Sequence, residues 1–298
     1  MEIHQLRYFC AVAQHGTFTR ASEIEHVAQP SLSQQILKLE AELGSRLFDR
    51  LPRSARLTVF GKAFLPKAER ILQDLNDSKT EMLEMAGEEK GEVVLGIIPT
   101  IAAYLLPKIL IGFSSRYASI KVKVIEDITP VLLERLHQGS MDLAVVALPV
   151  PGSEISCIEM FEERFFAALP DSHPLANRKS LALKELKSEP FLLLKEGHCF
   201  RDSLITACRE SRIRPNVAFE SGQFATILAM VAAGMGVSAV PAMAVETHPG
   251  CCFVPLAEKN SIRKVGIVRL RHHFETRVQE ILVKHLLELR ERHASAIS

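Results

Sequence analysis

Apolar residues in the first 45 positions recur at helical spacing and predict three short helices, over residues 5–15, 18–25 and 30–43. A glycine follows the first and the third of these segments, as is common where a helix ends. Thr17 or Thr19 is placed to cap the first amides of the second segment. In the third, apolar side chains recur at steps of four, three and four, which puts them on one buried stripe.

The opposite face of the third segment carries hydroxyls and amides instead of the Glu and Lys of most solvated helices. Such side chains can approach base edges in DNA, and a cation can meet a phosphate. Residues 47–58 then read as two short strands around an arginine-bearing turn, so residues 1–58 predict a winged helix-turn-helix. The alternative is a helical domain whose polar helix is only solvated. The candidate DNA-binding residues are Gln29, Ser31, Ser33, Gln34 and Lys38 on the helix and Arg50 and Arg53 on the wing.

Residues 59–90 form a separate segment in which apolar residues from Phe64 to Met85 alternate between steps of four and three. A period of 3.5 residues over three heptads is typical of a helix that pairs with another helix, so we predict a dimerisation helix. The alternative is a helix packed on the core of its own chain. Pro66 requires that the helix either begins near that residue or bends there. Residues 87–91 are expected to form a hinge.

From residue 91 onward, short apolar runs alternate with helical segments, which predicts parallel sheets with helices on both faces in two α/β subdomains. Ligands gather at the carboxyl ends of strands in such sheets, here at residues 99–100, 127–129 and 197–199. The predicted strands are 93–98, 120–126, 143–148, 165–169, 191–194, 217–220, 237–241 and 264–270. The predicted helices are 100–117, 130–138, a segment after Cys199, 223–233 and 275–293.

The composition fits a folded chain of two or three domains, with 298 residues of which 47% are hydrophobic and 24% charged. No apolar stretch is long enough to span a membrane, and the N-terminus lacks the pattern of a secretory signal, so we expect a cytoplasmic protein with no membrane partner. Six cysteines would be reduced by default in that compartment. Their spacing matches no structural zinc site, and we expect no metal and no cofactor.

Cys199 and Cys208 lie nine residues apart in a segment that reads as a strand over 191–194, a turn over 197–202 and a helix over 203–212. If the intervening residues are helical, nine residues at about 1.5 Å each separate the two Cα atoms by roughly 13 to 14 Å, whereas a disulfide needs about 7 Å or less. The two can therefore bond only if the local structure changes, which suits a redox switch better than a structural disulfide. The alternative is that both are packing residues, because cysteine is among the most buried residue types.

Residues 21–50 resemble the DNA-binding domain of the LysR-type transcriptional regulators. The resemblance is carried by Val27-Ala28-Gln29-Pro30-Ser31-Leu32-Ser33, by Gln35-Ile36, and by Arg46-Leu47-Phe48-Asp49-Arg50. It implies double-stranded promoter DNA as the partner, dimers paired through residues 59–90 and assembled into homotetramers, and RNA polymerase as a further partner. It also implies that residues 91–298 form a periplasmic-binding-protein-like effector domain. Leu37 stands where the family often has an arginine, which lowers the expected number of phosphate contacts.

The effector region is similar to the hydrogen-peroxide-sensing members of that family. The matching segments are Gly96-Ile97-Ile98-Pro99-Thr100, Glu196-Gly197-His198-Cys199-Phe200-Arg201-Asp202 and Met230-Val231-Ala232-Ala233-Gly234. This resemblance implies that peroxide oxidises Cys199 and that Cys208 then closes a disulfide, while Thr100, Thr129 and His198 line the peroxide pocket. The position of Cys199 near a helix N-terminus, beside His198 and Arg201, should favour its thiolate. Ala218 departs from the histidine common in these relatives.

The sequence thus predicts a regulator of oxidative-stress genes that is not an enzyme. One alternative is a LysR-type regulator gated by a small organic ligand in the effector cleft, with cysteines that are not redox-active. Another is a thiol peroxidase that turns over peroxide with a reductant, against which the DNA-binding domain argues.

Overall fold

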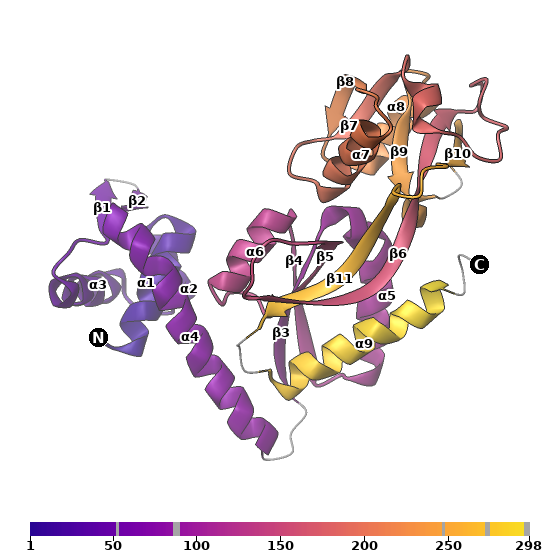
Figure 1. Ribbon diagram of the computed structural model, residues 1–298. Helices are drawn as coiled ribbons and strands as arrows, with labels where there is room; N and C mark the ends of the chain where they lie inside the picture. Colours follow the sequence, from indigo (N-terminus) through magenta and orange to yellow (C-terminus); the bar gives the residue numbers. More distant parts are fainter. Residues whose placement is uncertain (52–53, 86–89, 246–247, 272–274, 295–298) are drawn as a thin grey trace. The chain divides into compact units, whose positions relative to one another are not determined.

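The computed structural model describes the chain except for residues 52–53, 86–89, 246–247, 272–274 and 295–298 (Figure 1). The chain divides into two compact units, one of residues 1–88 with 134–141 and one of residues 89–133 with 142–298. Each unit has an apolar core of its own. Among the residues that the structure describes, no helix has both the length and the apolar character that crossing a membrane would need.

The first unit begins with the three predicted helices and the two-stranded wing. Gly16 and Gly44 adopt the left-handed conformation that ends the first and third helices, at φ 69° and 66°. The Thr17 hydroxyl caps the second helix by accepting from the Arg20 amide at 3.1 Å. The elements are α1 (Ile3–His15), α2 (Phe18–Ile24), α3 (Gln29–Leu43), β1 (Phe48–Leu51) and β2 (Ser54–Leu57), the two strands being antiparallel.

The apolar stripe of α3 forms the centre of this core. Leu32, Ile36 and Leu39 are fully buried, as predicted, whereas Leu43 is 38% exposed and does not complete the stripe. Glu40 is buried beside them and accepts from the backbone amides of Leu47 and Phe48 at 2.7 and 3.1 Å. Because a buried carboxylate needs such partners, Glu40 fixes the wing against the end of α3.

The long helix α4 (Val59–Met85) runs without interruption through Pro66, so a start at that proline is wrong. Ala68 on its predicted dimerisation stripe is fully buried in the core of the DNA-binding domain, and Phe64 packs on the same core. Farther along, Ile71 and Met82 are 41% and 59% exposed. The stripe therefore divides into a first part that packs on its own domain and a later part whose apolar side chains meet solvent.

The second unit contains the predicted alternation of strands and helices. Its first part comprises β3 (Gly91–Ile97), α5 (Pro99–Arg116), β4 (Ile120–Glu126), α6 (Thr129–His137, whose end belongs to the first unit), β5 (Leu143–Leu148) and β6 (Ile155–Pro170). There follow the 3₁₀ turn η1 (Leu183–Leu186), β7 (Pro190–Leu194), α7 (Cys199–Glu210), β8 (Asn216–Ser221) and α8 (Phe224–Ala232). The last elements are β9 (Ser238–Pro241), η2 (Ala242–Ala244), β10 (Cys251–Pro255), β11 (Ile262–Leu270) and α9 (Arg277–Ala294).

The main sheet is mixed, which corrects the prediction of purely parallel sheets. Its order is β10-β6-β11-β5-β3-β4, with β9 also paired to β6. Strand β3 is parallel to β4 and β5, and β7 is parallel to β8. Strand β11 is antiparallel to β5 and β6, and β6 is antiparallel to β9 and β10. The chain passes between the two subdomains on β6 and returns on β11, so these neighbours run in opposite directions (Figure 1).

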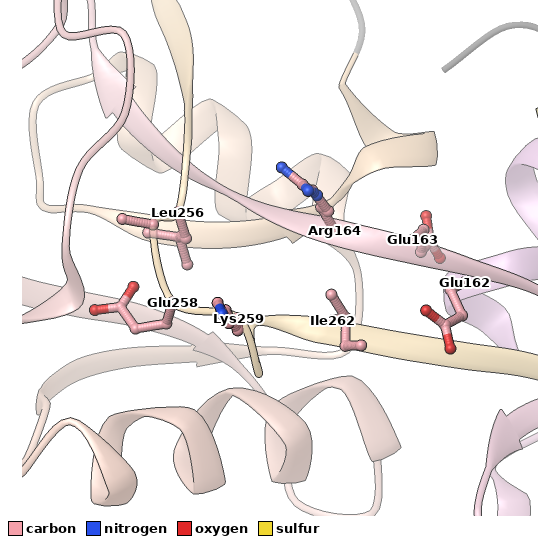
Figure 2. A pocket seen from close by; sticks show the side chains of 8 residues that line it. Glu162, Glu163, Arg164, Leu256, Glu258, Lys259 and Ile262 are labelled. Carbon is pink, nitrogen blue, oxygen red and sulfur yellow. The ribbon is translucent and has the colours of Figure 1, made fainter. Parts of the chain in front are cut away.

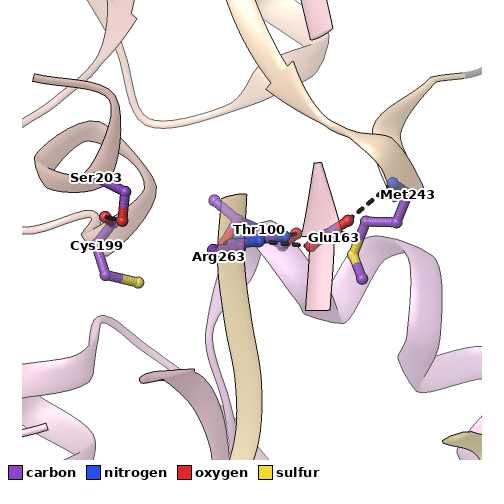
Figure 3. Close-up of polar contacts among 6 residues, drawn as sticks. All are labelled: Thr100, Glu163, Cys199, Ser203, Met243 and Arg263. Carbon is purple, nitrogen blue, oxygen red and sulfur yellow. Dashed lines mark hydrogen bonds and ion pairs between the residues drawn. The ribbon is translucent and has the colours of Figure 1, made fainter. Parts of the chain in front are cut away.

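A buried ion pair joins these two crossover strands. Arg263 of β11 donates from Nε to Oε1 of Glu163 on β6 at 2.5 Å, and the two side chains are 0% and 1% exposed. The other Glu163 oxygen accepts from the Met243 amide at 3.0 Å. Arg263 also donates to the hydroxyl of Thr100 at 2.9 Å and to its carbonyl at 3.1 Å (Figure 3). These contacts offset the desolvation of both charges and tie the crossover strands to the start of α5.

Removing one partner should therefore be costly. We expect Glu163→Ala to lower the free energy of unfolding by about 3 to 5 kcal/mol, because it leaves a buried guanidinium without its counter-charge. Urea unfolding of the full chain measures the change. The matched control is Glu92→Ala, which removes the exposed ion pair with Lys121 and should cost less than about 1 kcal/mol. Similar small losses in both variants would contradict a structural role for the buried pair.

Candidate functional site

The polar face of α3 lies on the surface of the DNA-binding domain. Four of its five predicted side chains are exposed and Ser33 is half-buried; the exposed ones are Gln29, Ser31, Gln34 and Lys38. Leu37 lies between them and is 51% exposed. Arg50 belongs to β1, and its side chain, like the whole of Arg53, lies outside the described residues. The helix thus presents short hydrogen-bonding groups at a spacing that a DNA groove can accept.

Cys199 is the first residue of α7, and His198 is the residue that precedes the helix. The Cys199 thiol is half-buried and free, and the Thr129 hydroxyl donates to its Sγ at 3.7 Å. Ser203, one turn on, donates to the Cys199 carbonyl at 3.0 Å (Figure 3). The unpaired amides at a helix N-terminus stabilise nearby negative charge, and a hydroxyl can donate to a sulfur anion. The site therefore has the groups that a reactive sulfur requires.

His198 directly precedes Cys199, and its imidazole is neutral near pH 7. Burial lowers its pKa, and the Asp202 carboxylate opposes that shift without cancelling it. The sequence suggested that the Arg201 charge would act on Cys199. Its guanidinium instead binds the Leu194 carbonyl and the Glu220 carboxylate. The positive charge of Arg201 is thus already matched by an acid.

Cys208 lies on the same helix but in a different environment. It is fully buried in the core of the second subdomain, and its thiol is free. Burial, together with the nearby Glu258 carboxylate, raises the pKa of Cys208 to about 11. Nine residues of helix correspond to about two and a half turns, so Cys199 and Cys208 lie on opposite faces of α7, roughly 13 to 14 Å apart along the axis. The predicted helix is present, but it begins at Cys199, four residues before the predicted start at Ser203, and ends at Glu210. Intact α7 therefore holds the pair beyond bonding distance.

Thr100, the third predicted pocket residue, is 4% exposed and is held by Arg263. The guanidinium of Arg263 also lies over the ring of Phe200, 5.5 Å from its centroid, and Phe200 follows Cys199 directly. The structure therefore places the Thr129 hydroxyl at the Cys199 sulfur and links Thr100 to this helix through Arg263, whereas His198 is adjacent to Cys199 in the chain. Sequence reasoning missed Arg263 and Glu163, because both lie just outside the predicted strands 264–270 and 165–169 and charged residues ordinarily indicate a solvated surface.

Two of the cavities among the described residues of the effector domain border residues discussed above, Thr100 and Glu163. One of about 200 Å³ is lined by Pro99, Thr100, Ala103, Tyr104, Glu126, Leu194, Gly222, Gln223, Phe224 and Ala225. Figure 2 shows a wider one of about 520 Å³, lined by Glu162, Glu163, Arg164, Leu256, Ala257, Glu258, Lys259 and Ile262. No cysteine lines either cavity. Among the described residues, no group of three or more His, Cys, Asp or Glu side chains could hold a metal ion.

The raised pKa predicts that Cys208 is unreactive while α7 is intact. The thiolate is the reactive form, and at about pH 8 a pKa near 11 leaves its population about a hundredfold below that of an ordinary cysteine. We expect iodoacetamide to modify Cys208 at least about a hundredfold more slowly in the folded, reduced protein than in urea. Peptide mass spectrometry follows the reaction. Comparable rates in both conditions would contradict this assignment.

Comparison with known proteins places this architecture in one family. Residues 3–62 match the model for bacterial regulatory helix-turn-helix proteins of the lysR family, and residues 86–291 match the LysR substrate binding domain. The chain is 34% identical over 272 residues to the DNA-binding transcriptional dual regulator OxyR of Escherichia coli (strain K12). The aligned region covers 90% of this chain and 89% of that protein. It is 31% identical over 287 residues to YybE, an uncharacterized HTH-type transcriptional regulator of Bacillus subtilis (strain 168), with coverage of 96% and 98%.

A solved structure has the same arrangement of elements. A full-length OxyR variant from Pseudomonas aeruginosa matches with a TM-score of 0.79 and 31% identity, over 96% of this chain and 94% of that one. Both the sequence matches and this structure extend over the DNA-binding and effector regions. The chain therefore belongs to the LysR family of DNA-binding transcriptional regulators.

Proposed function

We propose that this LysR-type regulator senses hydrogen peroxide through Cys199 and Cys208 and controls oxidative-stress genes. The observation that carries the proposal is the environment of Cys199, a free thiol at the start of α7 with the Thr129 hydroxyl on its sulfur. The second thiol, that of Cys208, lies on the same helix and is buried and protonated. The likeness to OxyR supports the same reading.

The first step is attack of the Cys199 thiolate on one oxygen of peroxide. An S–O bond forms as the O–O bond breaks, so sulfur is oxidised to a sulfenic acid and the second oxygen leaves as hydroxide, which takes a proton to become water. The Thr129 hydroxyl, already directed at Sγ, can donate to the peroxide and to the departing oxygen. His198, neutral near pH 7, can supply a further hydrogen bond.

The second step joins the two cysteines. The Cys208 sulfur attacks the sulfenic acid, an S–S bond forms, and the hydroxyl leaves as water with the Cys208 proton. Intact α7 forbids this step, because it holds the sulfurs on opposite faces of the helix. Peroxide chemistry is thereby coupled to unwinding of α7, which converts a covalent event into a change of shape.

The DNA-binding role follows from the helix-turn-helix. We propose that α3 enters the major groove of promoter DNA, with Gln29, Ser31, Ser33 and Gln34 toward bases and Lys38, Arg50 and Arg53 toward phosphates. Two subunits would pair through the exposed later part of α4, where Ile71 and Met82 meet solvent, and dimers would assemble into a homotetramer. RNA polymerase would be contacted from the promoter-bound assembly.

The second candidate function is gating by a small organic ligand, and the cavity beside Thr100 is the observation that favours it. At about 200 Å³ it is smaller than the roughly 300 to 1,000 Å³ of typical ligand pockets. Its one formally charged lining residue is Glu126, which suits an organic anion poorly. Counting free thiols by mass spectrometry after peroxide treatment separates the two candidates: a sensor loses two thiols, at Cys199 and Cys208, and a ligand-gated regulator loses neither specifically.

The two cysteine variants should lose the response to peroxide at different steps. We expect Cys199→Ser to abolish the response to peroxide and Cys208→Ser to react normally but stop at the sulfenic acid or proceed to the sulfinic acid. A sulfenic-acid trap with peptide mass spectrometry reads both outcomes. The matched control is Cys157→Ser, which removes an exposed thiol on β6 and should behave as the parent protein does. Full disulfide-linked activation of the Cys199→Ser variant would exclude the mechanism.

Different residues of α3 should contact the bases and the phosphates of DNA. We expect Lys38→Ala to weaken binding to all sequences and to reduce the slope of log affinity against log salt by about 1, because one phosphate contact is lost. Gln34→Ala should mainly relax sequence preference, costing about 1 to 3 kcal/mol at the cognate site. Fluorescence anisotropy with cognate and scrambled duplexes measures both effects. An identical loss of specificity in the two variants would refute the assignment.

A further inference from the structure

Arg201, in the first turn of α7, makes two contacts outside its own helix. Its Nη1 donates to the Leu194 carbonyl at the end of β7, at 2.8 Å, and it forms an ion pair with the Glu220 carboxylate of β8. The side chain of Arg201 is 13% exposed and that of Glu220 is 41% exposed. The guanidinium is therefore largely enclosed, and one strand end and one neighbouring strand hold it.

These contacts fix the part of α7 that carries Cys199. Strands β7 and β8 are parallel neighbours, with Leu193 opposite Glu220 and Leu194 opposite Ser221. Arg201 lies two residues after Cys199, so it attaches the first turn of the helix to the ends of both strands. Unwinding from this end requires the guanidinium to leave both the carbonyl and the carboxylate. Charge-assisted hydrogen bonds of this kind are stronger than those between neutral groups.

We infer that Arg201 and Glu220 form a positioning pair that keeps Cys199 at the start of an intact α7 and slows closure of the disulfide. The inference rests on the proposed function, and neither residue touches the reacting atoms. Slow closure lengthens the life of the Cys199 sulfenic acid, which a second peroxide can oxidise to the sulfinic acid. The pair thus sets the balance between reversible disulfide formation and irreversible over-oxidation.

The test variant is Glu220→Gln, which removes the charge and keeps the size and a hydrogen-bonding oxygen. In the reduced protein we expect hydrogen exchange of the α7 amides to accelerate about fivefold, the factor that corresponds to about 1 kcal/mol for a partly exposed pair. With peroxide, disulfide closure should accelerate by about the same factor, and formation of the sulfenic acid should stay within about twofold of the parent rate. The control Glu92→Gln, at the exposed pair with Lys121, should change neither rate.

A double-mutant cycle shows whether the two residues act together. In an Arg201→Met background, which lacks the guanidinium, adding Glu220→Gln should change neither α7 exchange nor closure further. An equal acceleration by Glu220→Gln with and without Arg201 would overturn the pair. The pair would also be overturned if the Glu220→Gln single variant showed the same rates of disulfide closure and of α7 hydrogen exchange as the parent protein.

Hydrogen exchange of the reduced protein also separates this inference from the proposed function. It needs no peroxide, so it reports on the pair even if the cysteines prove inert. Cys199 and Cys208 that never react with peroxide would overturn the sensing proposal and, with it, the effect on closure. Peroxide-dependent disulfide formation with unaltered α7 exchange in Glu220→Gln would overturn the pair alone.

Discussion

The continuity of helix α7 is the constraint on which the account of this protein depends. A helix of 12 residues begins at Cys199 and places Cys208 two and a half turns later, on its opposite face and in the apolar core. The same helix therefore leaves the Cys199 thiol partly accessible and keeps the Cys208 thiol buried. Because no disulfide between these two cysteines can close across an intact helix, the proposed oxidation requires this segment to refold.

The rest of the effector domain supports that helix from several sides. Arg263 reaches across from the crossover strand β11, pairs with Glu163 on β6, and lies over Phe200 next to Cys199. It also holds both the hydroxyl and the carbonyl of Thr100. The crossover strands join the two subdomains, so a change in α7 would act on the very residues that tie them together. A chain of packed and charged contacts of this kind can carry coupling between sites, which double-mutant cycles can measure.

Much of the fold could be predicted from the sequence, and the exceptions have physical causes. Local periodicity placed α3, β4 and β5 well, because each has a clear stripe or apolar run, whereas α7 begins four residues before its predicted start at Ser203. The antiparallel pairing of β6, β9 and β11 was not predicted, since pairing is a tertiary property. Strand β10 and residues 155–164 of β6 were not predicted as strands, and residues 155–164 alternate too irregularly to show as one. Periodicity also could not tell that Ala68 packs on its own domain while Ile71 meets solvent. At the site, sequence motifs found Cys199, Thr129 and His198, but no local pattern marks the long-range pair of Arg263 and Glu163.

The most direct test of this account is hydrogen exchange of the parent protein before and after peroxide, with the disulfide mapped in the same samples. We expect the α7 amides, Cys199–Glu210, to be protected in the reduced protein and to lose that protection once Cys199 and Cys208 are bonded, whereas the amides of α8 should stay protected. A mapped disulfide between Cys199 and Cys208 with unchanged protection along α7 would contradict it.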